Sequence, residues 1–382
     1  MQLALVTETY PPEVNGVAMT LSRLASGLHN RGHKITLVRP RQHGEASFGP
    51  RIHNATTDLD QWLVAGWPIP FYNSLRIGAP AFALLRRRWQ ENRPDVVHVA
   101  TEGPLGYSAL KTARKLGIPI TSSFHTNFHQ YGGHYGLSFG RELALQYLRW
   151  FHNRTACTLV PTDEMSANLA GHRFERLAVL SRGVDAHLFS PAKRSDVLRH
   201  SWNAGPDDPV ILCVGRLAAE KNLYLAVEAY RAMRLINPRS RFVLVGDGPL
   251  RSKLAERYPD FIYAGTRRGE ELAAYYASSD VFLFSSITET FGNVVTEALA
   301  SGLVVAGFDY AAMRQHVRAG FNGYVAKFDD NAAFVQMACM VMSRRADWLA
   351  LRVAARAAAQ TISWEAIVAQ FEAKLASVIK SK

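Results

Sequence analysis

The stretch VFLFSSITETFGNVVTEALASGLVVA, residues 281–306, decides the fold of this chain. It begins with the apolar run 281–284 and ends with a second one, 303–306, and the segment between them has helical spacing from about residue 291. Continuous apolar runs separated by a helix are typical of parallel strands that are buried on both faces. The stretch therefore predicts a strand–helix–strand unit of a doubly wound α/β sheet.

The same pattern repeats along the whole chain. Further strands are expected at 3–6, 35–38, 96–99, 118–122, 210–214, 241–245 and 261–263, with helices such as 19–28, 223–233 and 269–277 between them. The turn-rich run 189–209 separates two such halves. We expect two doubly wound, Rossmann-like domains, with ligand sites at the carboxyl ends of strands and in the cleft between the domains.

The composition excludes several classes of protein. Apolar residues make up 48% and charged residues 20% of the 382, an ordinary globular mixture. No run approaches the ~18 apolar residues of a membrane-spanning helix, and the first residues lack the features of a signal peptide. Three widely spaced cysteines argue against a disulfide framework or a Cys-based zinc site and favour a reducing, cytoplasmic compartment.

The net charge of +12 favours anionic partners. Residues before Ala186 carry 20 Lys and Arg against 13 Asp and Glu, and the remainder carries 24 against 19. Because the excess of positive charge is spread over both halves of the chain, it suits phosphate-bearing small molecules or a phospholipid surface. A nucleic-acid binder would need a clustered basic face or a known reading motif. We therefore expect no nucleic-acid partner.

Two glutamates, Glu289 and Glu297, flank the helix start in the opening stretch. Backbone N–H groups at Gly292, Asn293 and Val294 would form an anion site there. At ~1.5 Å per helical residue the carboxylates are separated by up to ~12 Å, too far for a glycosidase pair. That separation suits the two ends of a nucleoside diphosphate sugar, although two solvated helix glutamates would give the same pattern.

Two strand-to-helix turns in the second half carry further candidates for donor contacts. Arg216 and Lys221 flank the turn after strand 210–214, and two cations at a strand's carboxyl end suit a diphosphate. Ordinary helix-end charges would look the same. Gly246 and Asp247 lie in the second turn, where a tight turn alone would explain the glycine.

The first half offers two loops that follow strands. Asn15 and Gly16 lie after the first strand, where backbone without a side chain can approach a phosphate or a sugar. His125 follows a later strand and is a candidate orienting or acid–base group. His129 and His134 raise the possibility of zinc, but the intervening glycines and the missing acidic or Cys partner disfavour it.

Other chemistries have little support. The D-x-D at Asp58 and Asp60 would bind a metal–diphosphate pair in some transferases, but it lies far from the other candidates and suits a turn. The sequence contains no H-E-x-x-H, C-x-x-C or P-loop motif. The G-x-S-x-G elbow of serine hydrolases is missing too.

A candidate membrane contact lies within residues 62–89. Phe82, Leu85 and Trp89 fall on one helical face, and the arginines at 86–88 provide charge. This combination suits a helix lying on an anionic membrane surface. A core-facing helix with a solvated basic side is equally consistent.

Together these segments resemble a retaining glycosyltransferase of family 4 with the GT-B fold, over nearly the whole chain. The resemblance rests on PPEVNGV (11–17), His125, Arg216 with Lys221, GDGP (246–249) and the E-x7-E pair Glu289 and Glu297. Three finer stretches resemble the branch that glycosylates membrane lipids, which includes sulfoquinovosyl-diacylglycerol synthases and mannosyltransferases acting on phosphatidylinositol mannosides or glucuronosyl diacylglycerol. They are VHVATEGPLGYSALKTARKLGIP (97–119), SSFHTNFHQYGGHYG (122–136) and LSRGVDAHLF (180–189).

The resemblance implies roles for the donor-side residues. Arg216 and Lys221 would neutralise the leaving diphosphate. Glu297 would hydrogen-bond the ribose, and Glu289 would contact the hydroxyls of the donor sugar. The backbone from Phe291 to Val294 would line the phosphates and the sugar.

The remaining implied roles concern the base, the sugar and the chemistry. Gly16 would line the phosphates, Arg267 would lie near the base, and His125 would lie beside the donor sugar and orient the reacting groups. The family uses no metal and no protein nucleophile. The acceptor attacks the front face of the sugar and the departing phosphate takes its proton, so positioning and charge stabilisation would do most of the work.

The resemblance also implies an organisation and a substrate class. Residues 1–190 would form the acceptor-side domain, joined by the C-terminal helix 362–382, and residues 191–361 would bind the nucleotide sugar. The enzyme would move a mannose- or glucose-type hexose from a GDP- or UDP-sugar to a lipid such as a diacylglycerol or phosphoinositide glycolipid, at the inner face of the plasma membrane. A polysaccharide or lipopolysaccharide acceptor, or a nucleotide-sugar epimerase with this fold, are the alternatives.

Overall fold

The computed structural model divides into two compact units. It describes residues 1–13, 15–42, 45, 51–54, 57–69, 72–125 and 138–380, with backbone alone at 51–54, 57–58, 69, 72–75 and 138–141. Unit 1 comprises residues 1–182 with 364–382, and unit 2 comprises residues 183–363. The sequence-based division stood a few residues away, at 190/191 and 361/362. Helix α15 (Trp364–Lys380) belongs to unit 1 although it ends the chain.

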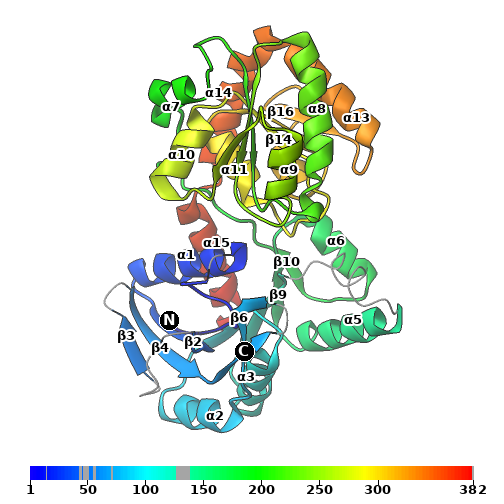
Figure 1. Cartoon of the computed structure of the whole chain (residues 1–382). Helices are drawn as coiled ribbons and strands as arrows, with labels where there is room; N and C mark the ends of the chain where they lie inside the picture. Colours follow the sequence, from blue (N-terminus) through cyan, green and yellow to red (C-terminus); the bar gives the residue numbers. More distant parts are fainter. Residues whose placement is uncertain are drawn as a thin grey trace. The chain divides into compact units, whose positions relative to one another are not determined.

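Unit 1 is built on a sheet of eight described strands in the order β10-β9-β8-β7-β1-β2-β4-β3 (Figure 1). Neighbouring strands are parallel except β3 and β4. The strands are β1 (Gln2–Val6), β2 (Lys34–Pro40), β3 (Arg51–Asn54), β4 (Thr57–Val64), β7 (Val96–Val99), β8 (Ile120–Ser123), β9 (Cys157–Val160) and β10 (Leu177–Val179). The direction of winding reverses between β1 and β7, which marks the switch point where such sheets bind ligands.

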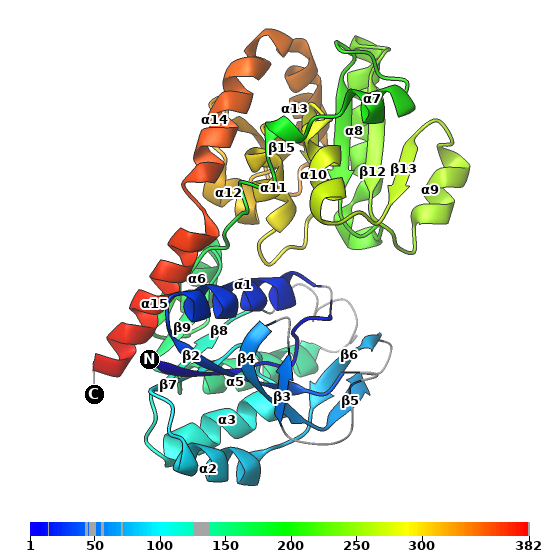
Figure 2. The same ribbon diagram turned by 90° about the vertical axis from the view of Figure 1, so that its left-hand side faces the viewer.

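Helices cover both faces of this sheet, which explains why its strands read as continuous apolar runs. The described helices, besides α15, are α1 (Gly16–Asn30), α2 (Phe82–Glu91), α3 (Pro104–Lys115), α5 (Ser138–His152) and α6 (Asp163–Gly171). Leu3 and Leu5 of β1 pack with side chains of α1 and α15 on one face. Ala4 and Val6 pack with α2 and α3 on the other (Figure 2). A separate hairpin, β5 (Gly66–Ile69) and β6 (Tyr72–Gly78), precedes α2.

Helix α2 corrects one expectation. Leu85 and Trp89 are only 0% and 1% exposed, because they pack into the core beneath the sheet. Phe82 alone of the three apolar residues is exposed, at 41%. The apolar face of this helix is therefore a core face, and the prediction that it lies on a membrane is wrong for Leu85 and Trp89.

Unit 2 has a six-stranded parallel sheet in the order β13-β12-β11-β14-β15-β16. The strands are β11 (Val210–Val214), β12 (Arg241–Val245), β13 (Ile262–Gly265), β14 (Val281–Phe284), β15 (Val304–Phe308) and β16 (Gly323–Ala326). This is the strand order 3-2-1-4-5-6 of a dinucleotide-binding sheet, and its switch point lies between β11 and β14.

The helices of unit 2 also form two layers (Figure 1). On one face lie α8 (Leu223–Ile236), α9 (Arg251–Arg257) and α13 (Asn331–Ser343). On the other lie α10 (Gly269–Ala277), α11 (Asn293–Ala300) and α14 (Trp348–Gln360), with α7 (Asp196–Ser201) and α12 (Ala311–His316) completing the set. Alternate residues of β11 again enter opposite cores, Ile211 into the first and Leu212 into the second. No described helix in either unit is long and apolar enough to cross a bilayer.

Candidate functional site

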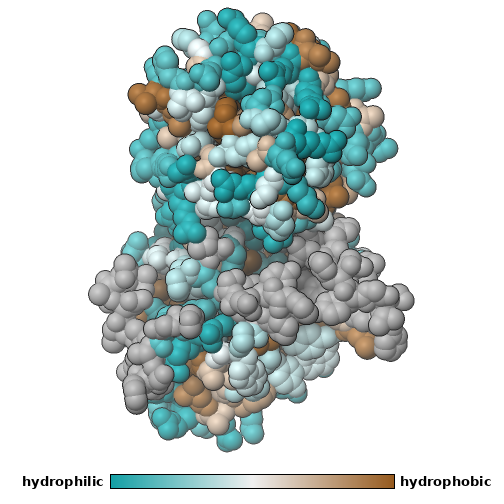
Figure 3. Space-filling model, viewed as in Figure 1, coloured by the Kyte–Doolittle hydropathy of each residue, from teal (hydrophilic) through white to brown (hydrophobic). Residues whose placement is uncertain are grey.

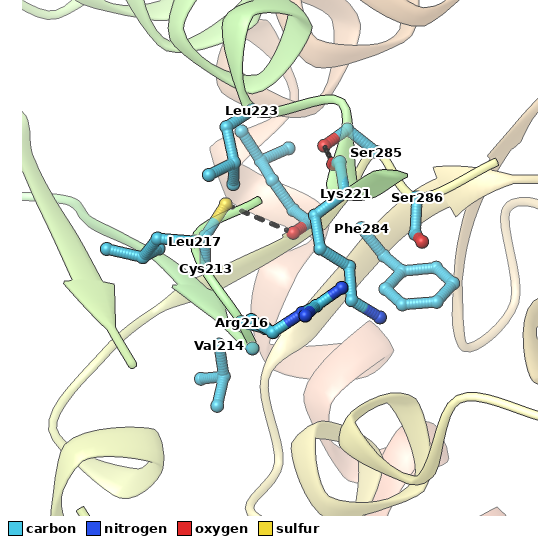
Figure 4. Close-up of a pocket in the computed structure, with 11 residues that line it drawn as sticks. Cys213, Val214, Arg216, Leu217, Lys221, Leu223, Phe284, Ser285 and Ser286 are labelled. Carbon is cyan, nitrogen blue, oxygen red and sulfur yellow. Dashed lines mark hydrogen bonds between the residues drawn. The ribbon is translucent and has the colours of Figure 1, made fainter. Parts of the chain in front are cut away.

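The switch point of unit 2 carries a shallow pocket (Figure 4). One wall is the segment Cys213–Leu217 at the end of β11, and another is Leu283–Ser286 at the end of β14. Lys221 and Leu223 complete it from the turn into α8. The pocket therefore lies at the carboxyl edge where the winding of the sheet reverses, as expected for a ligand site of this fold.

Two cations extend to the same side of this pocket, Arg216 and Lys221 (Figure 4). Arg216 Nε donates to Glu220 Oε1 at 2.9 Å, and Lys221 Nζ contacts Glu289 Oε1. Burial alone would raise the pKa of Glu220, but the hydrogen bond from Arg216 brings it below its ordinary value. Each cation thus has a carboxylate partner that an incoming anion would have to displace.

Glycines stand at two positions of the turn after β12, where its backbone closely approaches the loop after β11. A Cβ on Gly246 would lie 1.9 Å from the carbonyl oxygen of Gly215, and one on Gly248 would lie 2.6 Å from that of Leu217. Leu217 N donates to Asp247 O at 2.8 Å across the same gap. The glycines of the GDGP motif therefore let the turn after β12 support the loop that carries Arg216.

The Asp247 side chain is engaged within its own turn. Its Oδ1 accepts from Gly248 N at 2.7 Å, and Oδ2 accepts from Arg251 Nη1 at 3.3 Å. Arg267, which follows β13, is also paired with a nearby residue at the surface of its unit. Its Nη1 donates to Glu271 Oε1 at 2.5 Å, and its guanidinium lies 5.6 Å from the centre of the Tyr275 ring.

The loop that carries Glu289 is held by a tyrosine from a distant segment. Tyr310 Oη donates to Glu289 O at 2.7 Å and accepts from Glu289 N at 3.3 Å. Helix α11 begins at Asn293, two residues later than predicted, because Gly292 takes the left-handed conformation with φ of 92°. The Phe291 side chain is 1% exposed in the core, so only its backbone can face a ligand.

Glu297 occupies a different environment from Glu289. It lies on α11 after Val294 and accepts a hydrogen bond at 2.9 Å from Tyr276 Oη of α10. Burial raises the pKa of Glu297 to about 7, although the hydrogen bond from Tyr276 opposes this shift. The two glutamates of the E-x7-E pair therefore have separate partners, one beside a cation and one beside a phenol.

Three sequence candidates lie in unit 1, at the carboxyl edge of its sheet. Asn15 caps α1, since its Oδ1 accepts from Ala18 N at 2.8 Å and its Nδ2 donates to Thr9 Oγ1 at 2.7 Å. Gly16 is the first residue of the helix and is exposed. His125 directly follows β8, and burial together with the cation of Arg182 lowers its pKa well below the ordinary range. His125 is therefore a neutral imidazole at physiological pH.

Several candidates fall outside the described residues: Val14 of the PPEVNGV loop, the side chain of Asp58, His129 and His134. The prediction of a turn for the D-x-D motif of Asp58 and Asp60 is wrong, because both residues belong to strand β4. The Asp60 Oδ2 accepts from Trp62 Nε1 at 3.2 Å. Among the described residues no group of three His, Cys, Asp or Glu side chains is arranged to hold a metal ion.

Sequence reasoning missed the residues that hold these candidates in place. Glu220 is four residues from Arg216, but the two lie in a loop and a 3-10 turn, so no helical spacing indicated the pair. Tyr276 lies 21 residues before Glu297, and Tyr310 lies 21 residues after Glu289. Nothing local in the sequence links such residues, because only the order of strands in the sheet brings them together.

Comparison with known proteins matches the chain to glycosyltransferases over both units. Residues 14–188 match the profile of Glycosyltransferase Family 4, and residues 208–344 match that of Glycosyl transferases group 1. The chain is 33% identical to a GDP-mannose-dependent alpha-mannosyltransferase of Mycolicibacterium smegmatis, covering 98% of each chain. It is 26% identical to the alpha-monoglucosyldiacylglycerol synthase of Acholeplasma laidlawii, over 80% of this chain and 79% of the relative.

Solved structures share the fold across the whole chain. Sucrose-phosphate synthase from Thermosynechococcus elongatus superposes with a TM-score of 0.79 at 18% identity and covers 100% of both chains. Anabaena HepE, crystallised with UDP and glucose, gives a TM-score of 0.73 at 17% identity, covering 99% of this chain and 100% of HepE. At this identity the likeness concerns the fold, which is the pair of Rossmann-like sheets expected for GT-B.

Proposed function

Because the chain is a hexosyltransferase that belongs to glycosyltransferase family 4, we propose that it transfers mannose from GDP-mannose to a hydroxyl group of a membrane glycolipid or diacylglycerol. Three relatives, 31–34% identical, are named GDP-mannose-dependent alpha-mannosyltransferases, which supports the donor. The monoglucosyldiacylglycerol synthases and a sulfoquinovosyl transferase of Arabidopsis thaliana support the lipid acceptor.

The observation that carries the proposal is the cationic pair at the switch point of unit 2. Arg216 and Lys221 face one pocket, each balanced by a carboxylate. A diphosphate brings more negative charge than either carboxylate, and Arg binds it with two parallel hydrogen bonds while Lys acts as a point charge. The cations are thus set in place before the leaving group develops its charge, which is the arrangement that lowers a barrier most.

The transfer needs no nucleophile from the protein. The bond between the sugar's anomeric carbon and the phosphate oxygen breaks while a bond to the acceptor oxygen forms on the same face. The acceptor's proton passes to the departing phosphate oxygen, and the α-linkage of the donor is retained. His125 is neutral and therefore orients groups by hydrogen bonding rather than supplying a proton. The two cations supply the charge that a metal ion supplies in other transferases, so the reaction proceeds without one.

We infer that the enzyme meets its acceptor as a peripheral protein at the inner face of the membrane. A lipid acceptor requires contact with the bilayer, and the chain's net charge of +12 favours an anionic surface. Unit 1 is the acceptor-side unit in this proposal, since the cationic pocket for the donor lies in unit 2.

The test is an assay with purified protein, GDP-mannose and phospholipid vesicles containing glucosyl diacylglycerol or diacylglycerol, with EDTA present. We expect a mannosylated lipid by mass spectrometry, and a thermal stabilisation by GDP of about 2.7 kcal/mol at 100 times its Kd. UDP and ADP are the comparison nucleotides. Arg234→Ala is the control for variants of the pocket cations Arg216 and Lys221, because Arg234 is near the carboxyl end of α8, away from the pocket.

Each part of the proposal has an outcome that contradicts it. Stabilisation by UDP and not by GDP would replace the donor. Transfer to soluble oligosaccharides in place of vesicle lipid would move the acceptor to polysaccharide or lipopolysaccharide. Conversion of the donor sugar without any acceptor would indicate an epimerase. Loss of turnover in EDTA, restored by Mg²⁺, would overturn the metal-free mechanism.

A further inference from the structure

Three helices of unit 1 together present a row of stacked aromatic rings with cations beside them. We name this surface the aromatic row and define it by Phe82 of α2, Tyr107 of α3, and Tyr147 and Trp150 of α5. We propose that the aromatic row is the surface by which the protein docks on an anionic phospholipid bilayer. The inference deepens the proposed function, on which it rests for the lipid nature of the acceptor.

The rings form a continuous series across the helices. Phe82 meets Tyr107 edge to face with 5.9 Å between centroids. Tyr107 stacks on Trp150 at 5.7 Å, and Trp150 stacks on Tyr147 at 6.1 Å. Phe82 and Tyr147, the two ends, are 41% and 39% exposed, while the two rings between them are half-buried. Tyr and Trp prefer the boundary between headgroups and acyl chains, because one part of each side chain is apolar and the other polar.

Cations accompany the aromatic side chains at one helical spacing. On α2 and α3 an aromatic residue is followed four positions later by a cation on the same face: Phe82 and Arg86, Tyr107 and Lys111. Arg154, in the turn after α5, has the same spacing from Trp150. Lys111 Nζ lies 5.7 Å from the centroids of both Tyr107 and Trp150, and the Arg154 guanidinium lies 4.3 Å from that of Trp150. The surface over α2 and α3 accordingly mixes pale, brown and teal residues in Figure 3.

The positive charge of this surface is largely uncompensated. Arg114 and Lys115 extend the exposed face of α3 beyond Lys111. Among the described residues no carboxylate pairs with these three cations, nor with Arg86 or Arg154. A basic residue near an anionic leaflet contributes about 1 kcal/mol of attraction. Five such residues beside amphipathic rings therefore match the chemistry of an acidic lipid surface.

The aromatic row begins at the edge of the sheet where the acceptor is proposed to bind. Tyr147 Oη donates to the carbonyl oxygen of Glu102 at 2.6 Å, and Glu102 follows β7 at the switch point of unit 1. From there the rings continue over α3 toward α2. A lipid lying in a bilayer against this surface would have its headgroup at the same edge of the sheet, where the hydroxyl must be presented.

A single-stranded nucleic acid is the other polyanion that binds aromatic and basic side chains. It needs open ring faces on which bases stack. In the aromatic row the faces of Trp150 are occupied by Tyr107, Tyr147, Lys111 and Arg154. A bilayer needs only the ring edges and the charges, so the observed geometry favours the lipid.

The test is sedimentation with vesicles that contain no acceptor and no donor, so that docking is measured apart from transfer. We expect binding to phosphatidylcholine vesicles with about 30% phosphatidylglycerol and little binding to pure phosphatidylcholine. The variant Lys111→Glu/Arg154→Glu should weaken binding to the anionic vesicles by about tenfold or more. Phe82→Ser should weaken it about threefold through loss of an apolar contact.

A matched control is available in unit 2. Arg231 and Arg257 stack on the Tyr258 ring at 4.7 and 5.5 Å, so Arg231→Glu/Arg257→Glu makes the same change in charge and removes the same kind of contact. We expect this control to bind vesicles within about twofold of the wild type, since its cations lie outside the aromatic row. Equal losses in both double variants, or none in the first, would overturn the proposal.

Two further measurements distinguish a loss of docking from a loss of folding and from a loss of catalysis. GDP stabilisation of the Lys111→Glu/Arg154→Glu variant should equal that of the wild type, which shows that unit 2 is folded. Its turnover should fall on vesicles and recover when the acceptor is supplied in neutral detergent micelles. If no donor supports transfer while the wild type still binds anionic vesicles through Lys111 and Arg154, the proposed function fails and the docking surface stands. Binding of a single-stranded oligonucleotide that requires the residues of the aromatic row, without binding of vesicles, would overturn the docking surface.

Discussion

The two units wind their strands about the same kind of switch point, yet the side chains that follow the strands differ: unit 2 has two cations paired with carboxylates, and unit 1 has two glutamates. In unit 2 the turn after β11 presents Arg216 and Lys221. In unit 1 the corresponding strand ends, of β1 and β7, carry Glu8 and Glu102. Glu8 accepts hydrogen bonds from Leu105 N at 3.1 Å and Gly78 N at 3.3 Å, so it fills the amino end of α3 that an anion would otherwise take.

This difference fits the proposal that the two units bind two kinds of ligand. A helix start at a switch point attracts phosphate, and unit 2 keeps cations there to strengthen that attraction. In unit 1 the carboxylate of Glu8 accepts hydrogen bonds at the start of α3. Glu102 lies beside His152, with its Oε1 2.9 Å from Nε2 of the histidine. Carboxylates accept hydrogen bonds from hydroxyl groups, which are what a sugar or glycerol acceptor offers. The contrast supports the proposal that the phosphate-bearing donor binds unit 2 and the hydroxyl-bearing acceptor binds unit 1.

The largest expected effect follows from removing the cations of unit 2. Lys221→Ala should lower kcat roughly 10²-fold or more, because a charge that stabilises the leaving diphosphate is lost. Arg216→Ala should lower kcat by a similar order, with the smaller loss of the two, since its side chain is 58% exposed against 24% for Lys221. Steady-state turnover of GDP-mannose measures both. Near-wild-type turnover in both variants would remove the cationic pair from the mechanism.

The next effect concerns how unit 2 holds the nucleotide. The pKa of Glu297 is raised to about 7 by burial, and in the role that the family resemblance implies for it only the ionised form could accept from two ribose hydroxyls. The affinity for GDP should therefore rise as the pH increases through about 7. Glu297→Gln should bind GDP about tenfold more weakly at pH 8 and show no such rise.

A second variant separates the pH effect from a general loss of binding. The hydrogen bond from Tyr276 lowers the pKa of Glu297, so Tyr276→Phe should move the midpoint of the pH dependence upward. Titration calorimetry between about pH 6 and 8.5 covers both variants. A pH dependence that survives in Glu297→Gln would mean that another group titrates with nucleotide binding.

Part of the fold of both units can be predicted from the sequence, including strand 96–99 of unit 1 with its observed bounds. The strands 210–214, 241–245 and 281–284 have the bounds predicted for them, because long apolar runs buried on both faces leave little ambiguity. Strands β9 and β16, CTLV and GYVA, were missed because four residues of mixed character carry too weak a pattern.

The candidate site shows the same limit. Arg216 and Lys221 lie in the turn that follows strand β11, so the chain itself places them at the sheet edge. Glu8 also follows its strand directly, but a lone glutamate in a loop resembles any solvated acid. Its importance becomes visible only when Gly78 and Leu105, about 70 and 97 positions further on, are seen to donate to it. Long-range hydrogen bonds of this kind leave no local signal.

A glycine beside Glu8 gives a smaller effect confined to unit 1. A Cβ on Gly103 would lie 2.1 Å from Glu8 Oε1, so Gly103→Ala must displace the carboxylate from α3. We expect a loss of about 1–3 kcal/mol of stability and a raised KM for the acceptor, with the affinity for GDP unchanged. Gly171→Ala is the control, because nothing lies within 4 Å of its Cβ. A weakened affinity for GDP in Gly103→Ala alone would show that the two switch points are not independent.

The smallest effect is a pH dependence of stability that the two units share for different reasons. Burial raises the pKa of Glu8 to about 7 against backbone N–H donors, and that of Glu297 to about 7 against Tyr276. The folded state therefore holds protons that the unfolded state, with pKa values near 4.5, has released. By linkage these two groups stabilise fully below pH 4.5, and that stability is lost as the pH rises to about 7.

Other groups titrate as well, so the useful quantity is the difference in Tm between the wild type and Glu8→Gln or Glu297→Gln. Each variant should lose less Tm between about pH 5 and 8 than the wild type, by about 2–4 °C for each kcal/mol involved. Parallel curves for Glu8→Gln would mean that its carboxylate is already ionised in the folded protein, and unit 1 would then present a full negative charge at this switch point.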